Sequence, residues 1–306
     1  MNNDQAKDIS IIIVSWNVGG LLQRALKSIE ESLKRSENMG YSVSIETIVV
    51  DNASSDGSAG LVRLLFPHVK LIANDTNKGF GAANNQGLKM ATGRYIIFLN
   101  PDAVLIDAAL WQMYAFMEEQ PFVGLIGPKL INPDGTLQRS CRRFPTFWSA
   151  AMILLKLHNF FPASLPIRRY YMWAFEHKTI RRVDQIMGAC MMARRDVLDE
   201  VGDFDQKFYI FFEEADLCKR INNAGYIIFF YPNAIVEHRR SSSFVQKRPL
   251  WRQWHFAKSY QHYFWKHHNF VAAVLITGLS FASLGPAVLI ELINSAGIRL
   301  NKNPNL

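Results

Sequence analysis

Four acidic or imidazole side chains occur in this chain in an order that suits one kind of chemistry. They are Asp51, Asp102, Glu214 and His238, and the first two directly follow apolar runs at residues 48–50 and 95–99. Both runs have the length and composition of buried strands. Each carboxylate is therefore expected just beyond the carboxyl end of a strand, where open α/β sheets bind their ligands.

The sequence Asn100-Pro101-Asp102 is the strongest single motif. Pro101 ends the preceding strand and projects Asp102 from it, where a carboxylate can share a Mg²⁺ or Mn²⁺ ion with the diphosphate of a substrate. His238 ends another apolar run, just before two arginines, and can complete such a metal site. The alternatives are structural, namely a Pro-Asp turn that only leaves a strand and a histidine that only serves the fold.

Three carboxylates, Glu213, Glu214 and Asp216, stand at the start of a helix predicted for residues 216–224. The aromatic run at 208–212 precedes them, and an apolar wall raises the pKa of a carboxyl group toward the range that a general base needs. Their alternative role is to stabilise the helix dipole. A donor whose diphosphate is already stabilised needs one such base for the incoming hydroxyl, whereas a glycoside hydrolase needs two carboxyl groups.

Two loops have the composition of a nucleotide site. Asp51 opens the polar run 51–58, which forms either an Asx-type helix cap or an acceptor for the imide of uracil or thymine. The loop 77–87 combines Lys78, several glycines and a helix start, which suits phosphates. Gly79 and Gly81 match only half of G-x-G-x-x-G and follow the third strand, so a Rossmann dehydrogenase is disfavoured.

The elements that must position these residues alternate regularly along the first hundred residues. Apolar strands are predicted at 9–14, 45–50, 69–73 and 95–99, with helices at 21–33, 60–66 and 82–91 between them. This alternation predicts an α/β fold with a doubly wound, mostly parallel sheet flanked by helices. Strand-like residues at 183–194, a helix at 195–201 and a strand at 226–231 that leads to His238 complete the domain.

The composition of the 306-residue chain leaves several partners open. A net charge of +8, with several paired arginines, suits nucleic acid, anionic lipid or a phosphorylated substrate equally well. The three cysteines have no Cys-x-x-Cys spacing, which argues against a disulfide framework or a thiolate metal site and favours a reducing compartment. Residues 1–8 lack the apolar core of a secretory signal.

Two apolar stretches indicate contact with a membrane. Residues 144–166 are rich in Phe, Leu and Trp but contain three prolines, which predicts an exposed excursion in place of a core helix. Residues 270–290 carry no formal charge, and about 20 such residues can cross a bilayer as a helix. The aromatic and basic residues before them are typical of the cytoplasmic interface. A full span, a helix in the membrane plane and a buried helix all remain open.

Together these motifs resemble those of the family 2 glycosyltransferases with the GT-A fold, especially their bacterial rhamnosyltransferase-like branch. The similarity runs from about residue 9 to residue 243 and rests on the segments 11–17 (IIIVSWN), 50–58 (VDNASSDGS), 77–87 (NKGFGAANNQG) and 99–102 (LNPD). It implies a catalytic domain at 1–245, with a nucleotide-binding half (1–128) and an acceptor half (129–245). A membrane-associating helical region at 246–306 is expected to follow.

The resemblance also implies a role for each matching residue. The carboxylate matching Asp51 binds the base, those matching Asp102 and His238 bind the metal, and the one matching Glu214 is the catalytic base. Gly188, Ala189 and Cys190 are expected to form a strand of small residues beside the acceptor. Further contacts to the donor are expected from Ser15, Asn17, Asn52, Lys78, Gly79, Asn100 and Arg239.

Two departures from the family pattern leave alternatives. Many relatives have aspartate where Glu214 stands, so Glu213 or Asp216 is an alternative base, and Asn100 replaces the first aspartate of Asp-x-Asp. The chain lacks the Gln-x-x-Arg-Trp motif of processive synthases, which implies one sugar per acceptor.

By this likeness we expect an inverting enzyme at the cytoplasmic face of the cell membrane that uses a divalent cation, Mg²⁺ or Mn²⁺. It would move a sugar, with L-rhamnose the favoured example, from a dTDP- or UDP-sugar to a lipid-linked or cell-envelope glycan, without a nucleic-acid partner. Transfer to polyprenyl phosphate and a non-catalytic sugar-nucleotide-binding or scaffolding protein are the alternatives.

Overall fold

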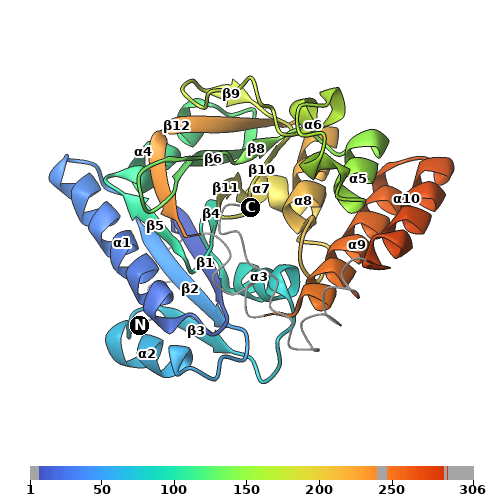
Figure 1. The fold of residues 1–306 in the computed structure, drawn as a ribbon. Coiled ribbons are helices and arrows are strands. Elements are labelled where there is room, and N and C mark those ends of the chain that lie inside the picture. Colours follow the sequence, from blue (N-terminus) through green and yellow to red (C-terminus); the bar gives the residue numbers. More distant parts are fainter. Residues whose placement is uncertain (1–6, 240–246, 286–287, 289–306) are drawn as a thin grey trace.

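The computed structural model describes residues 7–239, 247–285 and 288. Its centre is a mixed β-sheet with the strand order β3-β2-β1-β4-β11-β6-β12-β5, and helices cover both faces (Figure 1). The first half of this sheet is parallel and consists of β1 (Ile9–Ser15), β2 (Ile45–Asp51), β3 (Lys70–Ala73) and β4 (Tyr95–Leu99). The α/β class and the four predicted strands are confirmed.

The second half of the sheet adds antiparallel pairs. Strand β11 (Cys190–Arg194) lies antiparallel between β4 and β6 (Val123–Ile131), and the long β12 (Ile227–His238) runs parallel to β6. Strand β5 (Ala103–Ile106) closes the edge antiparallel to β12. Short strands extend or flank the sheet, namely β7 (Leu137–Gln138), β9 (Arg181–Arg182) and the separate pair β8 (Cys141–Arg142) and β10 (Gln185–Ile186).

Two hydrophobic cores lie on opposite faces of the sheet. On one face the sheet packs against α1 (Gly19–Asn38), α2 (Ser58–Leu65) and α4 (Ala109–Glu119), and α1 contributes Leu22, Leu26 and Ile29 at the predicted helical spacing. The other face is covered by α3 (Phe80–Met90), α7 (Arg195–Val201) and α8 (Glu213–Asn223). The parallel pairing of β1 to β4 brings the carboxyl ends of these strands to one edge of the sheet.

A third core joins four helices that lie beside the sheet. It unites α5 (Phe147–Leu154), α6 (Leu165–Tyr170), α9 (Pro249–His267) and α10 (Phe270–Ala282), which lie together in Figure 1. The expectation of an exposed excursion at 144–166 is wrong for α5, because Ala150, Ile153 and Leu154 are buried in this core. The first proline of the stretch precedes α5 and the last stands in the first turn of α6, where proline is tolerated. The short helix η1 (Leu157–Asn159) connects α5 to α6.

The C-terminal apolar stretch is only partly described. Helix α10 covers 13 residues and packs one side, with Ala273, Ile276 and Ser280, against its neighbours. Within residues 7–239, 247–285 and 288, no helix has the length and apolar character needed to cross a bilayer. The rest of the predicted segment 270–290, and the predicted domain boundary at 243–245, fall outside the described residues.

All three cysteines are buried and carry free thiols. Cys141 lies in β8, Cys190 in β11 and Cys218 in α8. Burial raises the pKa of each thiol to about 12.

Candidate active site

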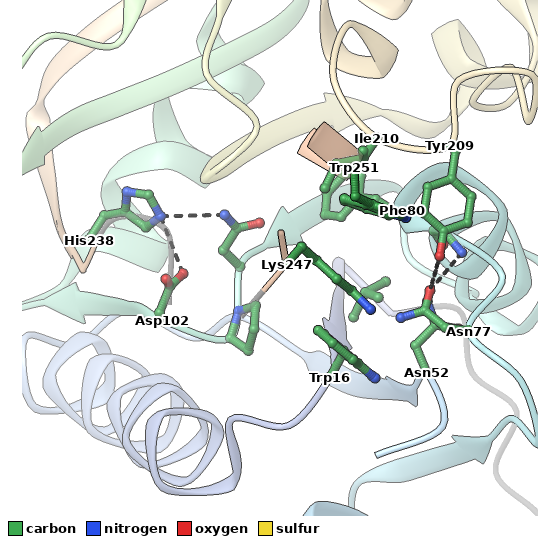
Figure 2. A pocket seen from close by; sticks show the side chains of 14 residues that line it. Trp16, Asn52, Asn77, Phe80, Asp102, Tyr209, Ile210, His238, Lys247 and Trp251 are labelled. Atoms are coloured by element: carbon green, nitrogen blue, oxygen red, sulfur yellow. Dashed lines mark hydrogen bonds and ion pairs between the residues drawn. The ribbon is translucent and has the colours of Figure 1, made fainter. Parts of the chain in front are cut away.

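Two cavities share the side chain of His238. The first has a volume of about 220 Å³ and lies beyond the carboxyl ends of β1 and β4 (Figure 2). Its lining comes from these strand ends, from the loop before α3 and from the start of α9, with Trp16, Asn52, Asn77, Gly79, Asn100, Asp102, Tyr209, Lys247 and Trp251 as main contributors.

Asp102 and His238 meet at one end of the first cavity. The Oδ1 atom of Asp102 lies 3.2 Å from Nε2 of His238, and both side chains are buried. The amide nitrogen of Asn100 lies 3.4 Å from the same Nε2 atom (Figure 2). The pairing of β5 with β12 places His238 opposite Ala103, the residue after Asp102. The two predicted metal ligands are thus brought together by the edge of the sheet.

Gln138 fixes the tautomer of His238. The side-chain nitrogen of Gln138 donates to Oδ1 of Asn132 at 2.8 Å and to the backbone oxygen of His238 at 3.1 Å. Its side-chain oxygen therefore faces Nδ1 of His238, 2.7 Å away, and accepts a hydrogen bond from Nδ1–H. In the neutral imidazole, Nε2 then carries the lone pair, and this atom faces the carboxylate of Asp102. Sequence spacing had given no sign of this residue.

The pair fits a divalent cation. A lone pair that faces a carboxylate is repulsive unless a cation or a proton lies between them, and the 3.2 Å separation is close to the edge of an octahedral Mg²⁺ site, about 3 Å. Two protein ligands suit an ion that also binds substrate phosphates. In the described parts of the chain there is no cluster of three or more such ligands.

Ser15 and Asp51 end neighbouring strands in register. One oxygen of Asp51 accepts a hydrogen bond from the backbone of Ser54 at 3.0 Å. The other, and the hydroxyl of Ser15, are buried without a partner among the described residues. Neither residue is among those that line the first cavity. An unsatisfied buried polar atom is costly, however, so these two atoms are suited to a polar ligand such as an imide. Asn17, with a φ of 52°, ties the two strand ends together by accepting from the backbone of Ser55 at 2.7 Å.

Asn52 and Gly79 line the first cavity at the end away from Asp102 and His238. The side chain of Asn52 accepts from the backbone of Lys78 and donates to Oδ1 of Asn77, both at 3.0 Å. Gly79 has a φ of +86°, and a Cβ atom there would lie 2.7 Å from the backbone oxygen of Tyr209. The side chain of Lys78 is exposed and lies outside the cavity lining, so this residue contributes its backbone alone.

Glu214 lines the second cavity. Its half-buried carboxyl group stands there with Arg142, Tyr170, Tyr260 and the shared His238. Burial raises the pKa of Glu214, and the backbone N–H groups of Glu214 and Ala215 and the charge of Arg142 offset part of this rise. Such a carboxyl group can accept a proton from a hydroxyl in the cavity.

The expected acceptor strand contributes one residue. A Cβ atom on Gly188 would lie 3.6 Å from Cβ of Glu214, so this glycine packs against the side chain of the candidate base. Ala189 and Cys190 are buried in the sheet and line neither cavity, which corrects their expected place beside the acceptor. Both side chains belong to the hydrophobic core of the sheet.

Glu213 and Asp216 lie outside both cavities. Glu213 is buried with one oxygen unpartnered in the described structure, and burial together with the charge of Glu214 raises its pKa well above the usual range. Arg239 is exposed, lines neither cavity, and donates its backbone N–H to the backbone oxygen of Asp102 at 2.9 Å. The geometry does not support the side chains of Glu213 or Arg239 in the roles expected for them.

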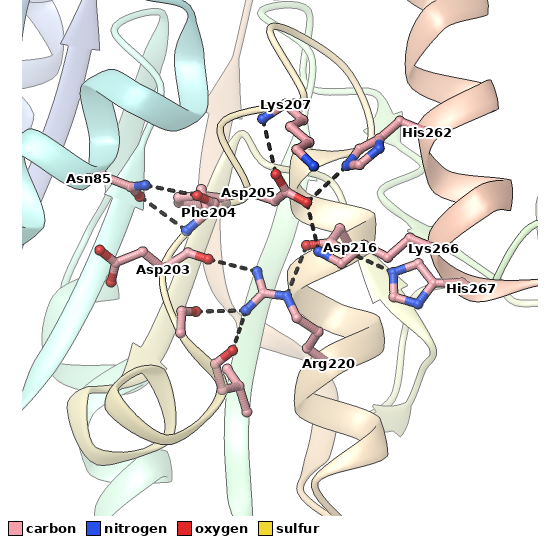
Figure 3. A network of polar contacts seen from close by, with 12 residues as sticks. Asn85, Asp203, Phe204, Asp205, Lys207, Asp216, Arg220, His262, Lys266 and His267 are labelled. Carbon is pink, nitrogen blue, oxygen red and sulfur yellow. Dashed lines mark hydrogen bonds and ion pairs between the residues drawn. The ribbon is translucent and has the colours of Figure 1, made fainter.

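Asp216 joins α8 to α9 in a polar network (Figure 3). Its fully buried carboxylate contacts Nε of Arg220 at 2.9 Å, Nζ of Lys266 at 2.8 Å and Nε2 of His267 at 2.7 Å. Lys266 also contacts Asp205 at 2.8 Å. With three cationic or imidazole partners, Asp216 has a structural place and not the alternative catalytic one.

The model for "Glycosyl transferase family 2" matches residues 10–202, more than half of the chain. The chain belongs to this family. This family 2 glycosyltransferase is 26% identical over 246 residues to the N-acetylglucosaminyl-diphospho-decaprenol L-rhamnosyltransferase of Mycobacterium tuberculosis, and the match covers 77% of each protein. It is also 26% identical to the low-salt glycan biosynthesis hexosyltransferase Agl10 of Haloferax volcanii, over 70% of this chain and 61% of that protein.

Solved structures place the glycosyltransferase in the GT-A fold. The structure of GalNAc-T7 with UDP, GalNAc and Mn²⁺ matches with a TM-score of 0.56 and 18% identity, over 78% of this chain and 44% of that chain. A mannosyltransferase from Pyrobaculum calidifontis in complex with GDP-Man and Mn²⁺ matches with a TM-score of 0.55 and 17% identity, over 96% and 82%. At these identities the likeness concerns the fold.

Proposed function

We propose that this glycosyltransferase is an inverting, metal-dependent enzyme that moves a single sugar from a nucleotide-diphosphate donor to a lipid-linked or cell-envelope glycan. One observation carries the proposal. His238 belongs to both cavities, so the Asp102–His238 pair of the first cavity adjoins the second cavity, in which Glu214 stands. The mycobacterial relative's name supports L-rhamnose as the sugar and a glycosyl diphospholipid as the acceptor. The dTDP form of the donor is proposed from the resemblance of the sequence motifs.

The proposed reaction is one displacement. Glu214 accepts the proton of the acceptor hydroxyl while that oxygen attacks the anomeric carbon from the side opposite the diphosphate. The bond from the anomeric carbon to the diphosphate breaks, and its electron pair leaves with the nucleoside diphosphate. Asp102 and His238 would hold a divalent cation, which neutralises negative charge on the leaving diphosphate. A single base gives inversion, because no enzyme nucleophile intervenes.

The donor base is assigned to the strand ends. Asp51 has one unpartnered carboxylate oxygen that can accept from the imide N–H of thymine or uracil, and the Ser15 hydroxyl can donate to a ring carbonyl. Asn52 and Gly79 then face the rest of the nucleotide across the first cavity. Asp51→Asn is expected to weaken binding of dTDP without lowering the melting temperature.

Association with a membrane surface is also part of the proposal. Trp148, Phe160 and Phe161 are exposed around α5 and η1, and Phe270 and Phe281 are exposed on α10. These helices belong to one core, and exposed aromatic and aliphatic side chains of this kind are typical of surfaces that meet a membrane. Co-sedimentation with anionic vesicles tests it: Phe160→Asp with Phe161→Asp should reduce binding, and unchanged binding would contradict it.

Transfer from radiolabelled dTDP- and UDP-sugars to a glycosyl diphospholipid tests the reaction. Glu214→Gln should abolish turnover and leave donor affinity nearly intact, whereas Asp102→Asn should weaken donor binding in the presence of Mn²⁺. Glu213→Gln is the matched control, because it removes the neighbouring carboxylate that lines neither cavity. Equal loss in both glutamine variants would refute the assignment, and donor binding without transfer to any acceptor would indicate a non-catalytic protein.

A further inference from the structure

Arg142 is a cation in the second cavity that the proposed reaction does not use. It lies in β8, is half-buried, and lines the cavity together with Glu214. Its guanidinium carbon lies 5.7 Å from the ring centroid of Tyr171. Among the described residues, no carboxylate forms an ion pair with it. Its neighbour Arg143, in contrast, is paired with Asp184 at 3.0 Å.

A guanidinium group without an anion is costly in a partly desolvated cavity. Its five N–H donors are arranged for two-point contact with a phosphate or carboxylate. Glu214 is the one carboxylate among the described residues that line this cavity, and its oxygens are needed for the proton of the acceptor. The charge of Arg142 reaches Glu214, yet no hydrogen bond joins the two side chains. The guanidinium group of Arg142 is therefore available to bind an anion that enters the cavity.

Helices α5, α6 and α9 give the cavity a largely aromatic and aliphatic wall. Tyr170, Phe256 and Tyr260 line it from α6 and α9, and Ile153 lines it from α5. The outer sides of α5 and α6 and the η1 segment between them expose apolar side chains, namely Trp148, Phe160, Phe161 and Leu165. Polar, cationic and apolar groups thus line this cavity or lie on the helices that form its wall, as an acceptor with a sugar, an anion and a hydrocarbon chain requires.

We propose that Arg142 binds the phosphate of a glycosyl phosphate or diphosphate acceptor and so presents a sugar hydroxyl to Glu214. This inference rests on the proposed function and adds the residue that recognises the phosphate of the acceptor. Arg142 lines the second cavity and not the first, so it serves the acceptor and not the donor. An acceptor that lacks a phosphate gains nothing from this contact.

The test compares two acceptors that carry the same sugar. One is N-acetylglucosaminyl diphosphate on a short prenyl chain, and the other is the phosphate-free octyl N-acetylglucosaminide, both used without vesicles so that no membrane lipid supplies phosphate. Arg142→Gln should raise the KM for the diphosphate acceptor about 10- to 100-fold, the usual worth of a hydrogen bond to a charged group. The KM values for the phosphate-free acceptor and for the dTDP-sugar should change less than about twofold, while a fall in kcat caused by the lost charge beside Glu214 should be equal for both acceptors.

Two further variants make the result specific. Arg142→Lys keeps the charge but loses the two-point contact, so it should fall between the wild type and Arg142→Gln. Arg143→Gln removes one positive charge at the adjacent position and should leave both acceptors unaffected. An equal fall in kcat/KM on both acceptors, without a selective rise in the KM for the diphosphate acceptor, would overturn the proposal. It would mean that Arg142 acts only through Glu214 or through the fold.

Calorimetric binding of the diphosphate acceptor without donor separates this inference from the proposed reaction. Binding that is present in the wild type and lost in Arg142→Gln supports the anion site even if no sugar is transferred. A wild type that transfers sugar but binds both acceptors equally well would refute the anion site and leave the reaction standing. Absence of binding to the wild type also refutes the anion site.

Discussion

Replacing Asp216 by asparagine tests whether this carboxylate holds α8 against α9. Removing one member of a buried ion pair costs about 3–5 kcal/mol, because the remaining charges stay desolvated. Lys266 and Arg220 keep 29% and 17% of their side-chain exposure and can partly rehydrate, so we expect the lower end, about 3 kcal/mol. With an unfolding entropy of about 2.1 cal/mol/K per residue, this lowers the melting temperature of the 306-residue chain by about 5 °C.

A matched control is available in α7, the helix that precedes α8 in the chain. Asp199 pairs with Nε of Arg195 at 2.9 Å, the same distance and i, i+4 spacing as in the Asp216–Arg220 pair but in the reverse order along the helix, and its side chain is 63% exposed. Exposed pairs contribute at most about 1 kcal/mol, so Asp199→Asn should shift the melting temperature by less than about 2 °C. Scanning calorimetry at pH 7.5 measures both variants.

The pH dependence has a defined sign. Burial alone would raise the pKa of Asp216, but hydrogen bonds from His267 and Lys266 and the charge of Arg220 hold it below its ordinary value of 3.8. Its stabilisation is therefore fully present above about pH 4 and is lost as the pH falls through the lowered folded-state pKa. Equal small shifts for Asp216→Asn and Asp199→Asn at pH 7.5 would refute this reasoning. Loss of turnover in Asp216→Asn with an unchanged melting temperature would restore Asp216 as a catalytic candidate.

Three other substitutions have defined outcomes. Gln138→Leu removes the acceptor for Nδ1–H of His238 and should weaken Mn²⁺ binding about 10-fold or more, as measured by the EPR signal of free Mn²⁺, while Gln138→Glu should retain it. In the wild type, the folded state keeps the proton of Glu213 to a higher pH than the unfolded state does, so the free energy of unfolding should fall by up to about 1.4 kcal/mol per pH unit above pH 4.5. Glu213→Gln should reduce this fall, and urea titrations at pH 5 and pH 8 measure it. Gly79→Ala forces a Cβ atom against Tyr209 at a positive φ and should lower both the melting temperature and its increase on adding dTDP, and an unchanged response to dTDP would contradict the assigned wall.

The parallel half of the fold follows from local sequence. The strands that end at Ser15 and Asp51 are rich in Ile and Val, and their parallel register places both side chains at the same sheet edge. Strand β6 escaped prediction because Gly124 and Gly127 interrupt its apolar run; a Cβ atom on Gly127 would overlap the side chain of Ile186, so tertiary packing demands these glycines. Local pattern alone does not show that requirement.

The site was predictable where a residue ends a strong element and not where it comes from a short one. Asp102 and His238 end strands or follow them directly, and they meet as expected. Arg142 and Gln138 lie in two-residue strands, which have no periodicity to read. The three carboxylates of α8 were equivalent by spacing, but successive helical residues are about 100° apart. Asp216 therefore points about 200° away from Glu214, toward α9.

The three buried thiols allow local unfolding of the enzyme to be followed by thiol labelling. Cys141, Cys190 and Cys218 belong to the two-stranded sheet, the central sheet and α8, and each is both inaccessible and protonated at neutral pH. A thiol reagent reacts with the thiolate, so labelling must wait until the surrounding element unfolds. The order in which the three sites are modified would reveal whether α8 detaches before the central sheet, and the protection added by a nucleotide sugar would show how far its binding is felt through the molecule.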